Sequence, residues 1–193
     1  MTQPAQGWHL RATVGKKELV ADAERIEFGE TAMAVDAIDS VSFWSWARKY
    51  GNRRNTCELR AGSDRLEVSF YVYRPERYPQ SRESMLWKEL VRYVDACVIP
   101  RVTKALVSRV AAGESIPFGR LRASEVGLTG RARLLPVSFP WSGLQIVDRG
   151  YEHLFIAGTD IQGRNRKVWL HMQYPNVVAI PLLANLMRRQ QAR

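Results

Sequence analysis

The stretch Cys57-Glu58-Leu59-Arg60-Ala61-Gly62-Ser63-Asp64 joins an apolar run to a turn signal, and alternating apolar residues follow it at Leu66, Val68 and Phe70. A second stretch, His153-Leu154-Phe155-Ile156-Ala157-Gly158-Thr159-Asp160, has the same order and precedes Val168, Leu170 and Met172. Ala-Gly-Ser/Thr-Asp between two apolar runs is typical of a hairpin. A helical segment follows each stretch. The sequence therefore predicts one strand-rich unit present twice, as an internal duplication.

The composition is that of a folded, basic protein. The chain has 193 residues, and 46% of them are hydrophobic, which is enough for a packed core. There are 29 Lys and Arg residues against 19 Asp and Glu residues, which gives a formal net charge of +10. Such an excess favours nucleic acid or an anionic membrane surface as a partner. The alternative is a soluble protein whose basic surface has no such partner.

The cysteines and the hydropathy bear on the compartment. Cys57 and Cys97 are the two cysteines, and their contexts, a strand and an apolar helix face, predict buried thiols. Two cysteines supply neither a metal-ligand spacing nor a disulfide framework. Residues 1–8 lack the basic-then-apolar order of a signal peptide, and no apolar run reaches the roughly 18 to 20 residues of a membrane span. We expect a soluble cytoplasmic protein without a transmembrane segment.

The first half reads as short strands followed by a long helix. Strands are expected over residues 9–14, 18–20, 26–28, 31–35, 37–46, 56–61 and 65–73. From Ser81 to residue 112 the apolar period becomes helical, and Leu90 and Val94 lie on the apolar face. Ser81 is the expected N-cap, Pro100 should kink or divide the helix, and Gly113 should close it.

The second half repeats this order. Strands are expected over residues 118–122, 124–128, 131–135, 137–147, 151–157 and 167–173. A final helix follows Pro175, and Pro181 belongs either to its first turn or to a kink. The prediction is an α+β fold of two antiparallel β-barrel or sandwich units, each capped by a C-terminal α-helix, at residues 9–112 and 113–193.

Three short motifs and the order of elements indicate a family. Ile116-Pro117-Phe118-Gly119, Gly127-Leu128 and Pro140-Trp141 follow a rhythm similar to the opening of bacterial pleckstrin-homology-like (PH-like) domains. Several short antiparallel strands closed by one helix are also the plan of that fold. The chain therefore resembles, over nearly its whole length, a bacterial tandem PH-like domain protein. The resemblance implies that Leu90 and Val94 in one unit, and Leu183 and Leu186 in the other, cap an open barrel.

The resemblance implies recruitment of lipid headgroups, peptides or proteins, and no catalysis. Phosphoinositide-binding members use a basic first hairpin loop. Its nearest counterparts here are Lys16 with Lys17 and Arg131 with Arg133, which do not form a basic signature. Fold analogy alone does not choose among the ligands.

The segment from Phe43 to Arg54 mixes aromatic rings with cations. Aromatic side chains stack on bases while Arg and Lys pair with phosphates, so the segment suits single-stranded nucleic acid or an anionic lipid surface. The alternative is a strand that fills the core and a solvated hairpin tip. The matching hairpin of the second half is also basic. The candidate ligand-binding residues are Trp44, Trp46, Arg48, Lys49, Tyr50, Arg53, Arg54, Arg164, Arg166 and Lys167.

No catalytic signature is found. His9, His153 and His171 stand apart in the sequence, and no nucleophile elbow, phosphate loop or metal-ligand motif accompanies them. We therefore predict a non-enzymatic adaptor that binds a protein or peptide partner, without cofactor or metal, by strand addition beside a helix. The alternative is binding of nucleic acid or an anionic surface through residues 43–54. Exposed strand edges also favour self-association as a homodimer.

Overall fold

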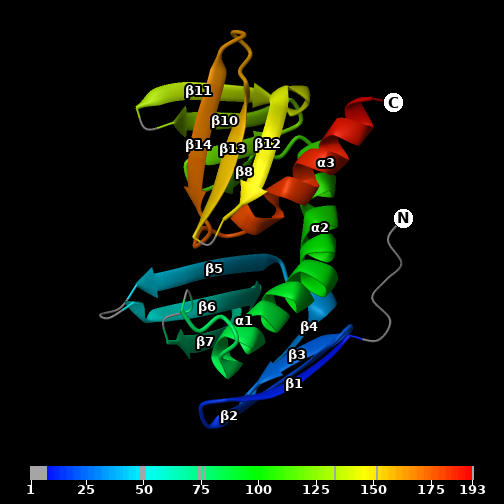
Figure 1. Ribbon diagram of the computed structural model, residues 1–193. Coiled ribbons are helices and arrows are strands. Elements are labelled where there is room, and N and C mark those ends of the chain that lie inside the picture. Colours follow the sequence, from blue (N-terminus) through cyan, green and yellow to red (C-terminus); the bar gives the residue numbers. More distant parts are fainter. Residues whose placement is uncertain are drawn as a thin grey trace. The chain divides into compact units, whose positions relative to one another are not determined.

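The computed structural model describes residues 8–47, 51–73, 75, 77–132, 134–150 and 152–192. The chain divides into two compact units, residues 1–101 and 102–193 (Figure 1). The division falls within the helix α2 (Ile99–Ala111). The expected boundary after residue 112 stays a prediction.

The first unit contains two antiparallel sheets. The first sheet has four strands in chain order, β1 (His9–Val14), β2 (Lys17–Asp22), β3 (Arg25–Phe28) and β4 (Thr31–Ala34). After a 3₁₀ turn (Val35–Ala37) the second sheet follows, with β5 (Ser40–Ala47), β6 (Arg53–Ala61) and β7 (Asp64–Val72). Because side chains alternate along a strand, each sheet buries the apolar residues of one face. Leu19 and Ile26 are buried in the first sheet, and Leu59 and Val68 in the second.

The helix α1 (Arg82–Tyr93) packs on the second sheet of this unit. Ser81 is its N-cap, and its hydroxyl accepts the backbone N–H of Ser84. The Trp87 ring meets the rings of Phe43 and Phe70 edge to face, with centroids 5.7 and 5.9 Å away. Leu90 and Val94 are fully buried, so the predicted cap and apolar face of the helix are confirmed.

Pro100 follows a π-helical stretch (Val94–Val98) and lies in the first turn of α2. Proline lacks the N–H that an α-helix needs and its ring crowds the carbonyl four residues back. The wider π turn before it relieves that conflict. At the other end, Gly113 donates to the carbonyl of Val110 and Glu114 donates to that of Arg109, which closes α2 at the expected glycine.

The second unit has the same order of elements. A four-stranded sheet comprises β8 (Ile116–Phe118), β9 (Leu121–Ser124), β10 (Gly127–Ala132) and β11 (Leu135–Pro140). A 3₁₀ turn (Trp141–Gly143) leads to β12 (Leu144–Arg149), β13 (His153–Thr159) and β14 (Asn165–His171). A further 3₁₀ turn (Val177–Ala179) precedes the helix α3 (Ile180–Gln191), which holds Pro181 in its first turn.

The predicted α+β class with antiparallel sheets and helices is confirmed. In each unit a four-stranded sheet, a three-stranded sheet and a helix follow one another (Figure 1). Among the described strands, no pairing joins the two sheets of a unit. Each unit therefore has two separate sheets and no closed barrel.

The bounds of three strands expected in the second unit were wrong. Residues 118–122, 124–128 and 131–135 each span a turn between two observed strands. Val126 and Leu134 are exposed turn residues, 68% and 88% accessible, although their apolar character is typical of strands. The run 137–147 is also two strands, because the 3₁₀ turn with the buried Trp141 interrupts it.

The turn signal of the second stretch was wrong as well. Ala61-Gly62-Ser63-Asp64 does enclose a two-residue turn, since Ala61 pairs with Asp64. Ala157, Gly158 and Thr159, however, lie inside β13, and the turn is formed by residues 160–164. Leu59 pairs with Leu66 in a buried row of the first unit, whereas Phe155, its counterpart in the second stretch, pairs with the exposed Trp169. The order of elements thus recurs, but the matching letters do not occupy equivalent positions.

Candidate functional site

Exposed aromatic side chains gather at the end of the second sheet of the first unit. The strand register places Trp46, Arg54 and Tyr71 in one row across β5, β6 and β7. Tyr73 follows β7 directly, and Tyr78 stacks on it. The four rings of Trp46, Tyr71, Tyr73 and Tyr78 are 58, 63, 53 and 44% exposed. We name Trp46, Arg54, Tyr71, Tyr73, Arg77 and Tyr78 the aromatic–arginine surface.

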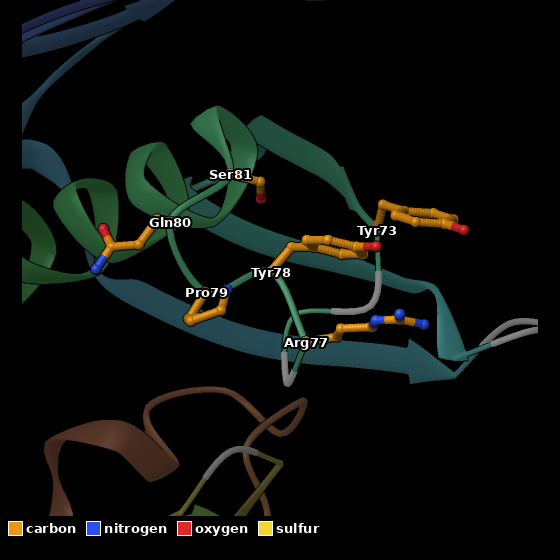
Figure 2. A pocket seen from close by; sticks show the side chains of 6 residues that line it. All are labelled: Tyr73, Arg77, Tyr78, Pro79, Gln80 and Ser81. Carbon is orange, nitrogen blue, oxygen red and sulfur yellow. The ribbon is translucent and has the colours of Figure 1, made fainter.

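A pocket opens beside the stacked tyrosines. The rings of Tyr73 and Tyr78 lie nearly parallel, with centroids 5.7 Å apart and an interplanar angle of 23°. The guanidinium carbon of Arg77 lies 5.7 Å from the centroid of the Tyr78 ring. Figure 2 shows these side chains together in the segment between β7 and α1. The pocket has a volume of about 520 Å³, and it is lined by Tyr73, Arg77, Tyr78, Pro79, Gln80 and Ser81.

A second hollow, the β7 groove, lies between β7 and the turn that joins β1 to β2. Its volume is about 550 Å³, and it is lined by Val14, Gly15, Lys16, Lys17, Phe28, Arg54, Glu67, Ser69, Phe70 and Tyr71. The Lys17 ammonium lies 5.4 Å from the centre of the Phe28 ring. Within the described part of the chain, no carboxylate pairs with Lys16 or Lys17. Two uncompensated cations therefore border this groove.

Arg54 links the groove to the aromatic–arginine surface. Its Nη2 atom donates to Glu67 at 3.4 Å and to the Ser69 hydroxyl at 3.3 Å, and its guanidinium lies 5.7 Å from the centre of the Tyr71 ring. Glu67 also pairs with Arg65 at 2.6 Å. Glu67 thus partly compensates the charge of Arg54. Glu67 and Ser69 together fix the guanidinium near the Tyr71 ring.

The same sheet face continues as a ladder of ion pairs. The Glu58 carboxylate is buried and binds Arg60 at 2.7 Å and Arg65 at 2.5 Å. Because Arg65 also reaches Glu67, the ladder runs without a break from Arg60 to Arg54. The exposed pairs of this ladder contribute little to stability, whereas the buried Glu58 carboxylate depends on its arginine partners.

The predicted binding residues of the first unit are only partly brought together. Trp46 and Arg54 lie in one row, whereas Trp44 is half-buried and lies two rows away, opposite Thr56. Arg53 is half-buried and pairs with Ala47 in the ladder. Arg48, Lys49 and Tyr50 lie outside the described residues.

The predicted cluster of the second unit has a structural role. Arg164 and Arg166 both bind the Asp160 carboxylate, at 3.3 and 3.2 Å. Burial alone raises the pKa of Asp160, but hydrogen bonds from Arg164, Arg166 and Gln162 outweigh it and lower the pKa to about 2. The two arginines thus hold a turn. Lys167 is exposed and lines a separate cavity of about 270 Å³ with Arg120 and Trp169.

Sequence reasoning missed Tyr71, Tyr73, Arg77 and Tyr78. Tyr71 and Tyr73 belong to the expected strand 65–73, and Arg77 and Tyr78 lie between that strand and the expected helix. The density of tyrosine and arginine from Tyr71 to Tyr78 was the available signal, since these residue types are enriched at interfaces. Their meeting at one end of β7 depends on the path of the connector between β7 and α1, which spacing does not reveal.

No helix in the described ranges is long and apolar enough to cross a membrane. Among the same residues, no group of three or more His, Cys, Asp and Glu side chains could hold a metal ion. The sequence matches no protein-family model, and no curated protein matches it significantly.

Proposed function

We propose that the chain is a non-enzymatic adaptor, built of two PH-like units, that binds a protein or peptide partner through the aromatic–arginine surface. The order of elements supports the PH-like part of the proposal. Each unit has four antiparallel strands, three more antiparallel strands and then a helix, as that fold does. The order of elements supports only a fold, so the proposed function is argued from the aromatic–arginine surface.

The observation that carries the proposal is the gathering of exposed Trp, Tyr and Arg side chains beside a pocket. These three residue types dominate the binding energy of protein interfaces. The stacking of Tyr73 on Tyr78 also restricts both rings before a partner arrives. Less side-chain entropy is then lost on binding, which favours affinity.

Single-stranded nucleic acid is the second candidate, because rings that stack on bases stand near Lys16 and Lys17. Three of the predicted cations, however, are engaged by carboxylates. Arg54 binds Glu67, while Arg164 and Arg166 bind Asp160. Since binding of nucleic acid relies on cations that can pair with phosphates, the peptide partner is the better supported of the two.

Selection from a display library of random 12-residue peptides tests the proposal. We expect enriched peptides whose affinity falls more than about tenfold in a Tyr73→Ala/Tyr78→Ala variant, as loss of a central hot spot requires. Trp169→Ala is the matched control, because Trp169 is an equally exposed ring in the other unit. Circular dichroism should show that all variants fold.

Two results would overturn the proposal. One is the absence of any enriched peptide together with binding of a labelled single-stranded oligonucleotide that weakens steeply with salt, which would favour nucleic acid. The other is enrichment of peptides that bind the Tyr73→Ala/Tyr78→Ala variant as tightly as the wild type.

A further inference from the structure

The strand β7 has a free edge within the described part of the chain. It pairs with β6 alone among the described strands. The backbone N–H of Asp39 donates to the carbonyl of Arg60 at 3.0 Å, so Arg60 turns its backbone groups toward the β5 side. Arg65, which stands opposite Arg60, therefore turns its own groups away from β6. By the same alternation Glu67, Ser69 and Tyr71 direct their N–H and C=O groups outward.

These outward groups line the β7 groove. Ser69, Phe70 and Tyr71 are consecutive and all border it, whereas a hollow on one sheet face would meet every second residue. Within the described chain, no hydrogen bond is made by the outward backbone groups of Glu67, Ser69 or Tyr71. Five strand residues, Glu67 to Tyr71, extend over about 17 Å, which is the length of a short peptide segment.

The chemistry of the groove indicates what would occupy it. Outward N–H and C=O groups at every second residue pair with another extended backbone. The opposite wall carries Lys16 and Lys17, which no described carboxylate compensates. Phe28 and Tyr71 add apolar surface to the lining of the groove. An acidic peptide in an extended conformation satisfies all three features, whereas a nucleic acid leaves the strand edge unpaired.

The second unit shows the same edge already covered. The strand β14 pairs only with β13 among the described strands. The side chain of Arg120 donates from its Nη2 atom to the carbonyl oxygen of Trp169 on that strand. Arg120 occupies the place that Lys16 has in the first unit, since each follows a glycine in the turn after the first strand of the unit. The cavity there is about 270 Å³, against about 550 Å³ in the first unit.

We infer that the β7 groove binds an acidic peptide as an added β-strand, and that Arg120 blocks the equivalent edge of β14. The inference rests on the proposed function for the class of partner. It adds the strand edge at which the partner binds, the charge of the partner and a difference between the two units. One peptide is therefore expected per chain.

The first test uses a display library of 12-residue peptides rich in Glu, Asp, Thr and Val. The tightest selected peptide is then synthesised with one backbone nitrogen methylated at a time. Strand addition predicts that methylation at alternate positions weakens binding more than about tenfold, while the intervening positions tolerate it. Amide NMR signals of Ser69 and Tyr71 should shift on binding.

Charge variants test the wall of the groove. Lys16→Glu/Lys17→Glu should abolish binding of the selected acidic peptide. Lys88→Glu/Lys104→Glu is the control, since it changes the net charge equally at two exposed helix positions outside the groove. Loss of binding in both double variants would show a merely global charge effect and would contradict the inference.

The Arg120→Ala variant tests the block. Isothermal titration should give one peptide per wild-type chain and two per variant chain. Arg122→Ala is the matched control, because Arg122 is an exposed arginine of the same sheet whose side chain binds Ser115. A stoichiometry of one in the Arg120→Ala variant would sink the part of the inference that concerns β14.

Failure of the inference differs from failure of the proposed function. Peptides that need Tyr73 and Tyr78 but tolerate every methylation and the Lys16→Glu/Lys17→Glu change would leave the adaptor standing and reject strand addition. The absence of acidic binders beside enriched neutral peptides would have the same meaning. Binding of an oligonucleotide alone would overturn both.

Discussion

His153 and His171 face each other across the ladder of β13 and β14, with ring centroids 4.2 Å apart. The Nδ1 atom of His171 is buried and has no hydrogen-bond partner among the described residues. Burial and then the nearby charge of His153 lower the pKa of His171 below its usual 6.5, and Glu152 opposes the shift. The pair therefore favours a neutral His171.

This pair predicts that acid destabilises the protein. The unfolded chain binds a proton at His171 below about pH 6.5, where the folded chain resists it, so stability is complete above that pH and falls below it. Urea unfolding at pH 7.5 and pH 5.5 should show the loss. A His171→Gln variant should show a smaller difference between the two pH values, and an unchanged difference would contradict the assignment.

Asp160 predicts a second pH effect, at lower pH. Its carboxylate accepts the backbone N–H groups of Gln162 and Arg164 at 2.9 Å and binds both arginines of the turn. Because its pKa falls from 3.8 to about 2, its contribution is complete above about pH 4 and disappears as the pH approaches 2. Asp160→Asn should lower the unfolding midpoint at pH 7, and the difference from wild type should shrink toward pH 2. A midpoint equal to that of wild type at pH 7 would exclude this role.

Leu90 and Leu183 are the positions at which the contribution of each helix to stability can be measured. Both are fully buried, on α1 and α3 respectively, whereas Leu186 is only half-buried. Changing either buried leucine to Ala should cost about 2 to 5 kcal/mol, because a cavity remains. Met85→Ala, at an exposed position of α1, should cost less than about 0.5 kcal/mol. Equal effects for Leu90→Ala and Met85→Ala in chemical denaturation would refute the packing.

The backbone around Gly127 leaves no room for a side chain. Its φ is +151°, and a Cβ atom there would meet the carbonyl oxygen of Phe139 on the neighbouring strand. Gly127→Ala should therefore cost about 1 to 3 kcal/mol or prevent folding. Gly163→Ala is the control, since Gly163 also has a positive φ of +74° but has open space around it. Its cost should stay near 1 kcal/mol, from backbone strain alone. Thermal melts that rank the two variants in reverse order would contradict this account.

The first unit was predicted more closely than the second. In the first unit the alternating run from Leu66 to Phe70 lies in the observed β7, because one face of that strand is buried and the other is exposed. In the second unit Val126 and Leu134 are apolar residues that lie exposed in turns, so the sequence pattern there resembled that of strands. Periodicity detects burial only through residue type, so an apolar turn residue shifts the predicted strand by half its length.

The candidate site was predicted in part. Trp46 and Arg54 were named from composition, and the register does place them in one row. The contribution of Tyr73 and Tyr78 depends on a connector that folds back, and the compensation of Arg164 and Arg166 depends on Asp160 in a turn. A cation in a sequence carries no sign of the carboxylate that will meet it in the fold.

The sequence by itself determined the α+β class, the long central helix with its cap at Ser81, and the basic charge, because these follow from local periodicity, capping chemistry and composition. Tertiary structure alone decided which edges stay free and which cations stay uncompensated. The edge of β7 is open beside Lys16, while that of β14 is covered by Arg120, although both residues follow a glycine in equivalent turns. The physical reason is that the cover of the β14 edge joins Arg120 and Trp169, which are 49 positions apart in the sequence, and such a contact exists only once the chain has packed.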